Sequence, residues 1–154
     1  MTKKLSQLES LLAAKNWQEA DVETRRIMLA IVGADKRDDL LLTQKDIQLF
    51  PCDDLINIDR LWREYSQGRF GLSVINRIYQ ECQRNYSQLA AQVGWRSGDK
   101  WLNYEELIFD ITAPVGHLPV TWLVPTTFGI YWQTRLARVG WELIFSRLDS
   151  CQIK

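Results

Sequence analysis

The sequence predicts an all-α fold: a single compact helical domain over residues 1–154, with a long aromatic-rich loop near its C-terminal end. The length of 154 residues corresponds to about one domain of ordinary size. Hydrophobic residues make up 46% and charged residues 25% of the chain, which is typical of an ordered globular domain. Apolar residues recur at helical spacing in three blocks, residues 3–33, 53–94 and 130–150.

Two helices with a short break between them are predicted over residues 3–33. The apolar positions at helical spacing are Leu5, Leu8, Leu11 and Leu12, then Trp17, Ala20, Thr24, Ile27, Met28 and Ile31. Gly33 then ends the second helix. Asp21 and Arg25 stand four residues apart, and we expect them on the solvated side of that helix as a weakly stabilising pair. Residues 34–50 are charged and irregular, and we expect a connection that carries a short helical turn.

Three helices are predicted in the block 53–94. Asp53 is placed to cap the first of them, which ends at residues 66–68. A second helix follows Gly71, and Asn85 opens a shorter third one. Gly94 is expected as the C-terminal cap of that third helix.

Helical periodicity fails between residues 95 and 125, where glycines and prolines interrupt a segment that is still rich in aromatic residues. A loop of this length in a compact domain tends to be functional, and this one is too apolar to be disordered. A short helix is expected within it over residues 102–109. The chain then finishes with a helical pattern over residues 130–150.

Charge and cysteine content narrow the class of protein. Lys and Arg total 19, as do Asp and Glu, so the net charge is zero and nucleic-acid binding is disfavoured. Cys52, Cys82 and Cys151 lie far apart, and an odd number of cysteines does not close into a disulfide framework, so we expect a reducing compartment. The first residues show no apolar leader, and no apolar stretch reaches the roughly 18 residues that span a bilayer. A cytosolic setting or its equivalent is therefore expected.

The sequence lacks the common catalytic motifs. His117 is the only histidine, and no GxSxG, HExxH, Walker or GxGxxG pattern is present. His117 and three scattered cysteines do not have the local spacing of a metal site. We therefore expect a protein that is not an enzyme and holds no metal with its own side chains.

Tryptophan is strongly enriched. Seven Trp in 154 residues is about three to four times the average frequency, which indicates a need for large flat apolar surfaces. Trp17 and Trp62 stand on helical stripes and are expected in the core. Trp95 and Trp101 lie in the irregular segment, where core packing and ligand contact are both open.

Seven motifs occur in a fixed order along the chain. They are LESLL at 8–12, WQEADVET at 17–24, FPCDDL at 50–55, IDRLW at 58–62, YSQGRFGLSV at 65–74, VGW at 93–95 and FDITAPVGHLP at 109–119. In sequence and in order these motifs resemble the genomes-uncoupled family of porphyrin-binding proteins. The resemblance runs from about residue 5 to Cys151.

The resemblance implies an all-helical domain shaped like a cupped hand, whose apolar palm takes protoporphyrin IX or magnesium protoporphyrin IX without a covalent bond. It implies a regulator that stimulates magnesium chelatase through the large porphyrin-binding subunit of that enzyme, in chlorophyll biosynthesis. The expected setting is the cytoplasm of a cyanobacterium or the plastid stroma, with no transmembrane segment and with peripheral membrane association left open. Two features depart from the family: the additional N-terminal helical bundle of many cyanobacterial members is not in this sequence, and Val115 stands where a basic residue is common.

A porphyrin is a flat apolar plate with two propionates, and it suits a concave apolar wall rimmed by cations. Burying one face of the plate removes roughly 200 to 300 Å² of apolar area, or about 5 to 7 kcal/mol before association costs. For the rim we predict Arg69, Arg96 and Lys100. For the wall we predict Phe70, Val74, Trp95, Trp101, Phe109, Leu118 and Pro119.

His117 belongs to the same predicted binding loop. It lies in a tight turn between Gly116 and Leu118, where its ring is expected to hold the loop by bonding to backbone groups rather than to ligate a metal.

Two alternative functions stay open. Some members of the family are reported to take linear bilins, so the chain could be a bilin-binding paralogue. From another class, it could be a helical protein-interaction module whose groove takes a partner helix and no tetrapyrrole. An absorbance titration with a porphyrin and with a bilin separates these alternatives.

Overall fold

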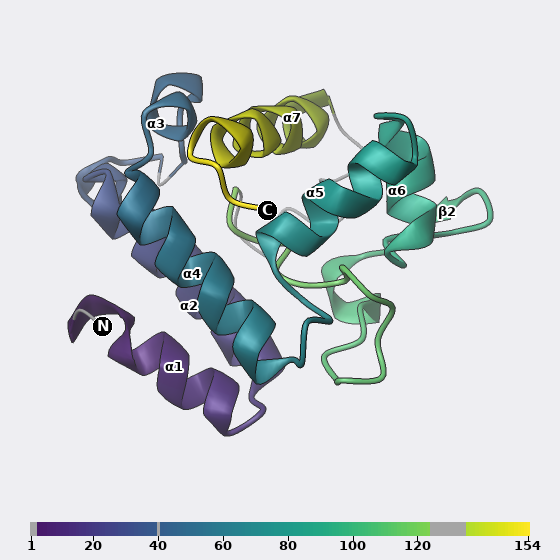
Figure 1. Ribbon diagram of the computed structural model, residues 1–154, viewed down its shortest axis with the longest axis horizontal. Helices are drawn as coiled ribbons and strands as arrows, with labels where there is room; N and C mark the ends of the chain where they lie inside the picture. The colour runs from purple at the N-terminus through teal and green to yellow at the C-terminus, as the bar shows by residue number, and fades with distance from the viewer. Residues whose placement is uncertain (1–2, 40, 124–134) are drawn as a thin grey trace.

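The computed structural model describes residues 3–39, 41–123 and 135–154. In these residues the regular elements are helices apart from one small hairpin, which confirms the predicted all-α class (Figure 1). The α-helices are α1 (Ser6–Ala13), α2 (Trp17–Ile31), α3 (Gln44–Gln48), α4 (Cys52–Tyr65), α5 (Leu72–Glu81), α6 (Tyr86–Gln92) and α7 (Arg135–Ser150). The 3-10 turns are η1 (Lys3–Leu5), η2 (Ala34–Lys36) and η3 (Tyr104–Glu106), and the strands are β1 (Arg96–Ser97) and β2 (Lys100–Trp101). None of the helices described here has the length and hydrophobicity to cross a membrane.

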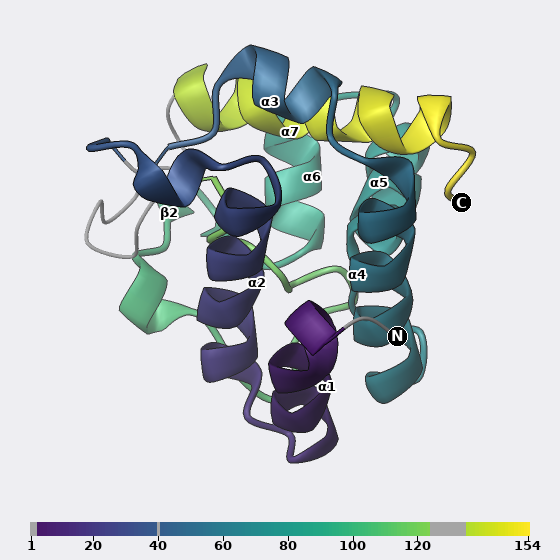
Figure 2. The same ribbon diagram turned by 90° about the vertical axis from the view of Figure 1, so that its left-hand side faces the viewer.

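The first part of the chain forms a helical layer in which α1 packs against α2 and α4 (Figures 1 and 2). An aromatic cluster joins this layer: the ring centroids of Trp17 and Phe70 lie 5.4 Å apart, and those of Trp17 and Trp62 lie 6.2 Å apart. The indole Nε1 of Trp62 donates a hydrogen bond to Thr24 Oγ1 at 2.9 Å. Both tryptophans are buried, which confirms their predicted place in the core.

Helix α4 starts two residues earlier than a cap at Asp53 predicts, so Asp53 is not its cap. Pro51 occupies the N-cap position, where no side-chain capping bond forms, and Cys52 is the first helical residue. Asp53 and Asp54 instead lie in the first turn, where negative charge complements the helix dipole. The predicted cap of α6 is confirmed, because the Asn85 side chain accepts a bond from the Gln88 backbone N–H at 2.9 Å.

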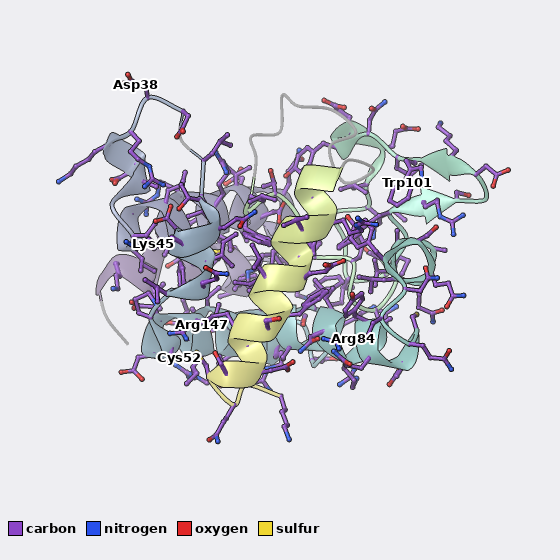
Figure 3. All side chains as sticks on the ribbon, turned by 90° about the horizontal axis from the view of Figure 1, so that it is seen from above. Asp38, Lys45, Cys52, Arg84, Trp101 and Arg147 are labelled. Atoms are coloured by element: carbon purple, nitrogen blue, oxygen red, sulfur yellow. A yellow bond between two sulfur atoms is a disulfide. The ribbon has the colours of Figure 1, made fainter. Side chains whose placement is uncertain are left out.

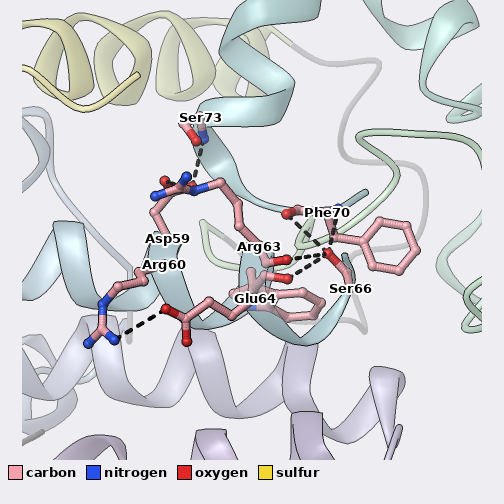
Figure 4. Close-up of polar contacts among 8 residues, drawn as sticks. Asp59, Arg60, Arg63, Glu64, Ser66, Phe70 and Ser73 are labelled. Carbon is pink, nitrogen blue, oxygen red and sulfur yellow. Dashed lines mark hydrogen bonds and ion pairs between the residues drawn. The ribbon is translucent and has the colours of Figure 1, made fainter. Parts of the chain in front are cut away.

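A buried carboxylate holds the junction between α4 and α5 (Figure 4). Asp59 accepts a hydrogen bond from the Ser73 backbone N–H at 2.8 Å and forms an ion pair with Arg63, whose Nε lies 2.9 Å from the carboxylate. At the end of α4, Ser66 Oγ accepts a bond from the Phe70 backbone N–H at 2.8 Å. These bonds fix the turn that directs the chain from α4 into α5.

The prediction that Asp21 and Arg25 lie on the solvated side of α2 is wrong. The side chain of Asp21 is fully buried, and Arg25 is only 8% exposed. Asp21 Oδ1 accepts a bond from the Val120 backbone N–H at 2.7 Å, and Asp21 Oδ2 accepts one from the Tyr104 hydroxyl at 3.0 Å. Residues 120–122 cover this face of α2, and the spacing of charges within one helix cannot show which face a distant segment covers. Burial raises the pKa of Asp21 to about 6.

The segment after α6 is irregular as predicted but contains a small hairpin. Strands β1 and β2 pair antiparallel, with Arg96 opposite Trp101. Instead of the helix predicted over 102–109, only the short turn η3 forms, and Asn103 and Glu106 close a capping box at its start. Residues 124–125 of the predicted loop and 130–134 of the predicted last helix lie outside the described residues.

Helix α7 lies across one end of the molecule and packs against α3 (Figure 2). Immediately after this helix, Cys151 forms a disulfide with Cys52, and their Cα atoms lie 5.4 Å apart. The expectation that the cysteines form no disulfide is therefore wrong, and Cys82 is the one left free. The two partners are 99 residues apart in sequence, so only the tertiary fold brings them together.

Candidate functional site

A surface cleft with a volume of about 510 Å³ lies between the start of α6, the hairpin and α7. Figure 3 shows Arg84 and Trp101 on the same side of α7, opposite the side that carries Lys45 and Cys52. The residues that line the cleft are Arg84, Asn85, Tyr86, Ser87, Trp101, Arg138 and Glu142. The volume falls within the range of small-molecule sites in proteins.

A stacked aromatic pair forms the apolar part of the cleft. The rings of Trp101 and Tyr86 are 20° from parallel, with centroids 6.1 Å apart. Beneath them, the buried Trp95 lies 6.5 Å from Tyr86 and 4.9 Å from Trp141, ring centroid to centroid. Trp101 is half-buried, so part of its ring surface is available to a ligand, while Tyr86 is buried.

Cations surround this aromatic pair. The Arg96 guanidinium lies 5.9 Å from the Trp101 ring centroid, and its Nη2 donates to the Ser87 carbonyl at 3.0 Å. Arg84 lies in the turn before α6 and is exposed. Arg138 on α7 is exposed and pairs with Glu142 at 3.8 Å, a distance at which the ion pair is weak. Flat aromatic surface bordered by arginines suits a planar apolar ligand that carries carboxylates at its edge.

Of the predicted wall, only Trp101 lines this cleft. The other positions Phe70, Val74, Trp95, Leu118 and Pro119 are buried and form core rather than an open surface. The chain folds inward at two points: the Gly116 backbone N–H donates to the Arg69 carbonyl at 2.8 Å, and the Gly71 backbone N–H donates to the Leu118 carbonyl at 3.0 Å. Of the two roles left open for Trp95, core packing and ligand contact, the structure shows core packing.

The remaining predicted residues lie apart from the cleft. Arg69 Nε donates to the Ala113 carbonyl at 2.8 Å, and Arg69 lines a separate hollow of about 370 Å³ together with Arg77 and Val115. Lys100 forms an ion pair with Glu106 at 2.7 Å, and Phe109 is half-buried against Tyr104. Of the three predicted rim cations, Arg96 alone contacts the aromatic pair.

His117 has the structural role that the sequence predicted. Its Nδ1 donates to the Val93 carbonyl at 2.7 Å, and its Nε2 accepts a bond from the Ile108 backbone N–H at 3.0 Å, an arrangement that requires the neutral Nδ1–H tautomer. Burial lowers the pKa of His117, which favours this neutral form. Gly94 has a φ of +84°, and a Cβ there would lie 3.1 Å from His117 Nδ1. The absence of a side chain at Gly94 therefore leaves room for the imidazole ring.

The part of the chain that the structure describes contains no cluster of side chains that could hold a metal ion. No three His, Cys, Asp or Glu side chains come together there as a metal site would require.

Of the seven residues that line the cleft, the sequence predicted only Trp101 as a site residue; the six that it missed are Arg84, Asn85, Tyr86, Ser87, Arg138 and Glu142. Arg84 and Tyr86 flank Asn85, the predicted helix cap, which was the one local signal that they stand at an exposed turn. Arg138 and Glu142 have the spacing of a helical ion pair, but nothing in the sequence places them opposite Trp101.

Comparison with known proteins matches the chain to one family and to curated relatives. A family model described as GUN4-like matches residues 1–141. The chain is 34% identical over 116 residues to the Ycf53-like protein of the cyanobacterium Synechocystis sp., covering 73% of this chain and 49% of that protein. It is 32% identical over 129 residues to the tetrapyrrole-binding protein, chloroplastic, of Arabidopsis thaliana, covering 74% and 47% respectively. The chain thus spans about half the length of the curated relatives that it matches.

Solved structures have the same fold. The ligand-free structure of Arabidopsis thaliana GUN4 superposes with a TM-score of 0.77 at 24% identity, covering 95% of this chain and 93% of that one. The structure of GUN4 from Chlamydomonas reinhardtii gives a TM-score of 0.72 at 24% identity, covering 92% and 87%. At this identity the two superpositions show the fold.

Proposed function

The chain belongs to the GUN4-like family, and on that basis we propose that it is a non-enzymatic tetrapyrrole-binding protein that uses the cleft beside Trp101. The observation that carries the proposal is the Trp101–Tyr86 stack with Arg84 and Arg138 on the same cleft. The Arabidopsis relative is named a tetrapyrrole-binding protein, which supports this class of ligand.

The residues of the cleft fit such a ligand. A tetrapyrrole offers an apolar plate that packs on an indole ring, and its carboxylates attract guanidinium groups, which bind them through paired hydrogen bonds. Arg138 is weakly paired and exposed, so it can turn toward an incoming carboxylate at little cost. His117 does not supply an axial bond to the ligand in this proposal, because both of its ring nitrogens are bonded to backbone groups.

We propose further that the ligand is protoporphyrin IX or magnesium protoporphyrin IX, bound without a covalent bond. The loaded protein would stimulate magnesium chelatase through its large porphyrin-binding subunit, in a cyanobacterial cytoplasm or a plastid stroma. Two observations support this setting: one relative comes from a cyanobacterium, and another is described as chloroplastic.

Absorbance titration tests the ligand. Protoporphyrin IX should shift its Soret band on binding and quench tryptophan emission, since the cleft is built on Trp101 and lies above Trp95. The dimethyl ester, which lacks the carboxylates, should bind about tenfold or more weakly. A linear bilin serves as the competing ligand. Unchanged Soret absorption and tryptophan emission at saturating porphyrin would refute the proposed function.

Charge variants locate the carboxylates. Arg138→Gln and Arg84→Gln should each reduce the preference for the free acid over the ester. Arg60→Gln is the matched control, because Arg60 also pairs with a glutamate four residues away in a helix but lies on α4, outside the cleft. An equal loss of preference in the Arg60 variant would mean that general surface charge, and not this cleft, attracts the ligand.

The partner is tested separately. Adding the porphyrin-loaded protein to magnesium chelatase should raise the rate of magnesium insertion, and the effect should require the large porphyrin-binding subunit. An unchanged rate with a protein that binds porphyrin would remove the chelatase from the proposal and leave tetrapyrrole binding in place.

A further inference from the structure

The Cys52–Cys151 disulfide joins two parts of the chain that bear on the cleft. Cys52 is the first residue of α4, and Cys151 follows the last residue of α7. Residues 52–151 form the loop that the bond closes, and every residue that lines the cleft lies within it. Both cysteines are only partly buried.

Helix α7 connects the disulfide to the cleft. Near its start it carries Arg138 and Glu142, which line the cleft, and near its end Arg147 Nε donates to the Phe50 carbonyl at 2.8 Å. Asp149 also accepts a bond from Asn76 on α5 at 3.0 Å. The C-terminal end of α7 is therefore fastened by one covalent bond and by hydrogen bonds, and the same helix carries two residues of the cleft wall. A helix is a rigid element through which a shift at one end can reach the other.

We propose that Cys52–Cys151 is a reversible thiol–disulfide site at which a dithiol reductant loosens α7 and weakens ligand binding in the cleft. The effect on ligand binding rests on the proposed function, whereas the effect on α7 does not. One thiolate of the dithiol attacks a sulfur of the bridge and forms a mixed disulfide, and the second thiol of the reductant then displaces the protein. The protein disulfide gains two electrons and two protons to give two thiols, and the dithiol is oxidised to its own disulfide.

The helix ends favour one direction of attack. Cys52 stands at the N-terminus of α4, where the helix dipole stabilises a thiolate, and Cys151 stands at the C-terminus of α7, where the dipole opposes one. Cys52 is therefore the better leaving group, and the reductant attacks the sulfur of Cys151. Two carboxylates of the same first turn counter this effect: Asp53 is adjacent to Cys52, and Asp54 opposes the thiolate less because it pairs with Lys4 at 2.9 Å.

The reduced protein stays folded, because the hydrogen bonds of Arg147 and Asp149 and the buried face of α7 remain. Losing a cross-link over a loop of this length should lower the midpoint of thermal unfolding by roughly 5 to 15 °C. The affinity for protoporphyrin IX should fall by about tenfold, a coupling of ordinary size between a site and a remote support.

The test uses the purified chain after treatment with glutathione disulfide and again after treatment with dithiothreitol. Alkylation under denaturing conditions should label Cys82 alone in the oxidised protein and all three cysteines in the reduced one. Thermal unfolding, amide hydrogen exchange in α7 and the dissociation constant for protoporphyrin IX are measured in both states. Cys151→Ser should resemble the reduced protein under either treatment, whereas the control Cys82→Ser should respond as the wild type does.

The measurements test the redox site, its effect on the cleft and the proposed function separately. Three labelled cysteines in the oxidised protein, or an unfolding midpoint and α7 exchange that do not change on reduction, would overturn the redox site. Equal porphyrin affinity in the two states, with the midpoint shifted, would overturn its effect on the cleft. Absence of porphyrin binding in both states, with the midpoint and α7 exchange shifted, would refute the proposed function and support the redox site.

Discussion

Replacing Asp21 with Asn should remove a pH dependence from the stability of this protein. The Asp21 side chain is fully buried under residues 120–122, and burial raises its pKa from 3.8 to about 6 despite hydrogen bonds from Val120, Tyr104 and Thr121, which lower it. The asparagine can keep the main bonds: its Oδ1 accepts from the Val120 N–H, and its Nδ2 donates to the Tyr104 oxygen. The substitution thus removes the charge and little else.

Proton linkage gives the sign and the size of the change in the free energy of unfolding with pH. Between about pH 4 and pH 6 the folded protein holds a proton on Asp21 that the unfolded chain has released, so the free energy of unfolding falls as the pH rises through this window. A pKa raised from 3.8 to about 6 corresponds to roughly 3 kcal/mol. The stability of Asp21→Asn relative to the wild type should therefore increase by roughly 3 kcal/mol between about pH 4 and pH 8.

Urea unfolding followed by tryptophan emission measures this difference, and subtracting the two proteins cancels the titration of all other groups. Asp21→Ala is the companion variant: it leaves the Val120 N–H buried without this acceptor, and it should be less stable than Asp21→Asn at every pH, by about 1 to 3 kcal/mol. If the difference between Asp21→Asn and the wild type stays constant over the whole pH range, the carboxyl does not titrate as its burial requires and the reasoning is wrong.

Three other substitutions test the architecture. Trp62→Ala should lower the free energy of unfolding by about 3 to 5 kcal/mol in chemical denaturation, since the indole is fully buried; a loss under about 1 kcal/mol would contradict its core role. Gly71→Ala should destabilise the protein by about 1 to 3 kcal/mol, because φ is +138° there and a Cβ would meet Arg63 Cγ at 2.9 Å; unchanged stability would contradict this contact. His117→Ala should weaken the binding of metal-free and magnesium porphyrin to a similar extent in absorbance titrations, and a loss confined to the magnesium form would make His117 a metal ligand.

The sequence predicts the helices of this fold well because their signals are local. Apolar spacing located the helices of the 3–33 and 53–94 blocks, and Asn85 marked the start of α6 through its own side chain. The same reasoning placed Trp17 and Trp62 in the core and gave His117 its backbone bonds. In each of these cases the signal is local, an apolar stripe on one helix or one tight turn, although the partners of these side chains lie elsewhere in the chain.

The remaining features depend on contacts between distant segments. Periodicity shows that α2 has a polar face at Asp21, but not that residues 120–122 will cover it. An aromatic loop can form a surface or core, and here the backbone bonds of Gly71 and Gly116 draw Leu118 and its neighbours inward. The Cys52–Cys151 bond and the approach of Arg138 to Trp101 likewise require the position of α7, which no local pattern provides.

The most direct test of the cleft is the dissociation constant for protoporphyrin IX of Trp101→Ala, beside Leu49→Ala as a control. Trp101 lines the cleft and is half-buried, so its removal should leave the fold nearly intact and weaken binding about 10- to 100-fold. Leu49 is 64% exposed and lies outside the cleft, so its removal should change the dissociation constant little. Wild-type affinity in Trp101→Ala, or an equal loss in both variants, would show that the tetrapyrrole does not bind beside Trp101.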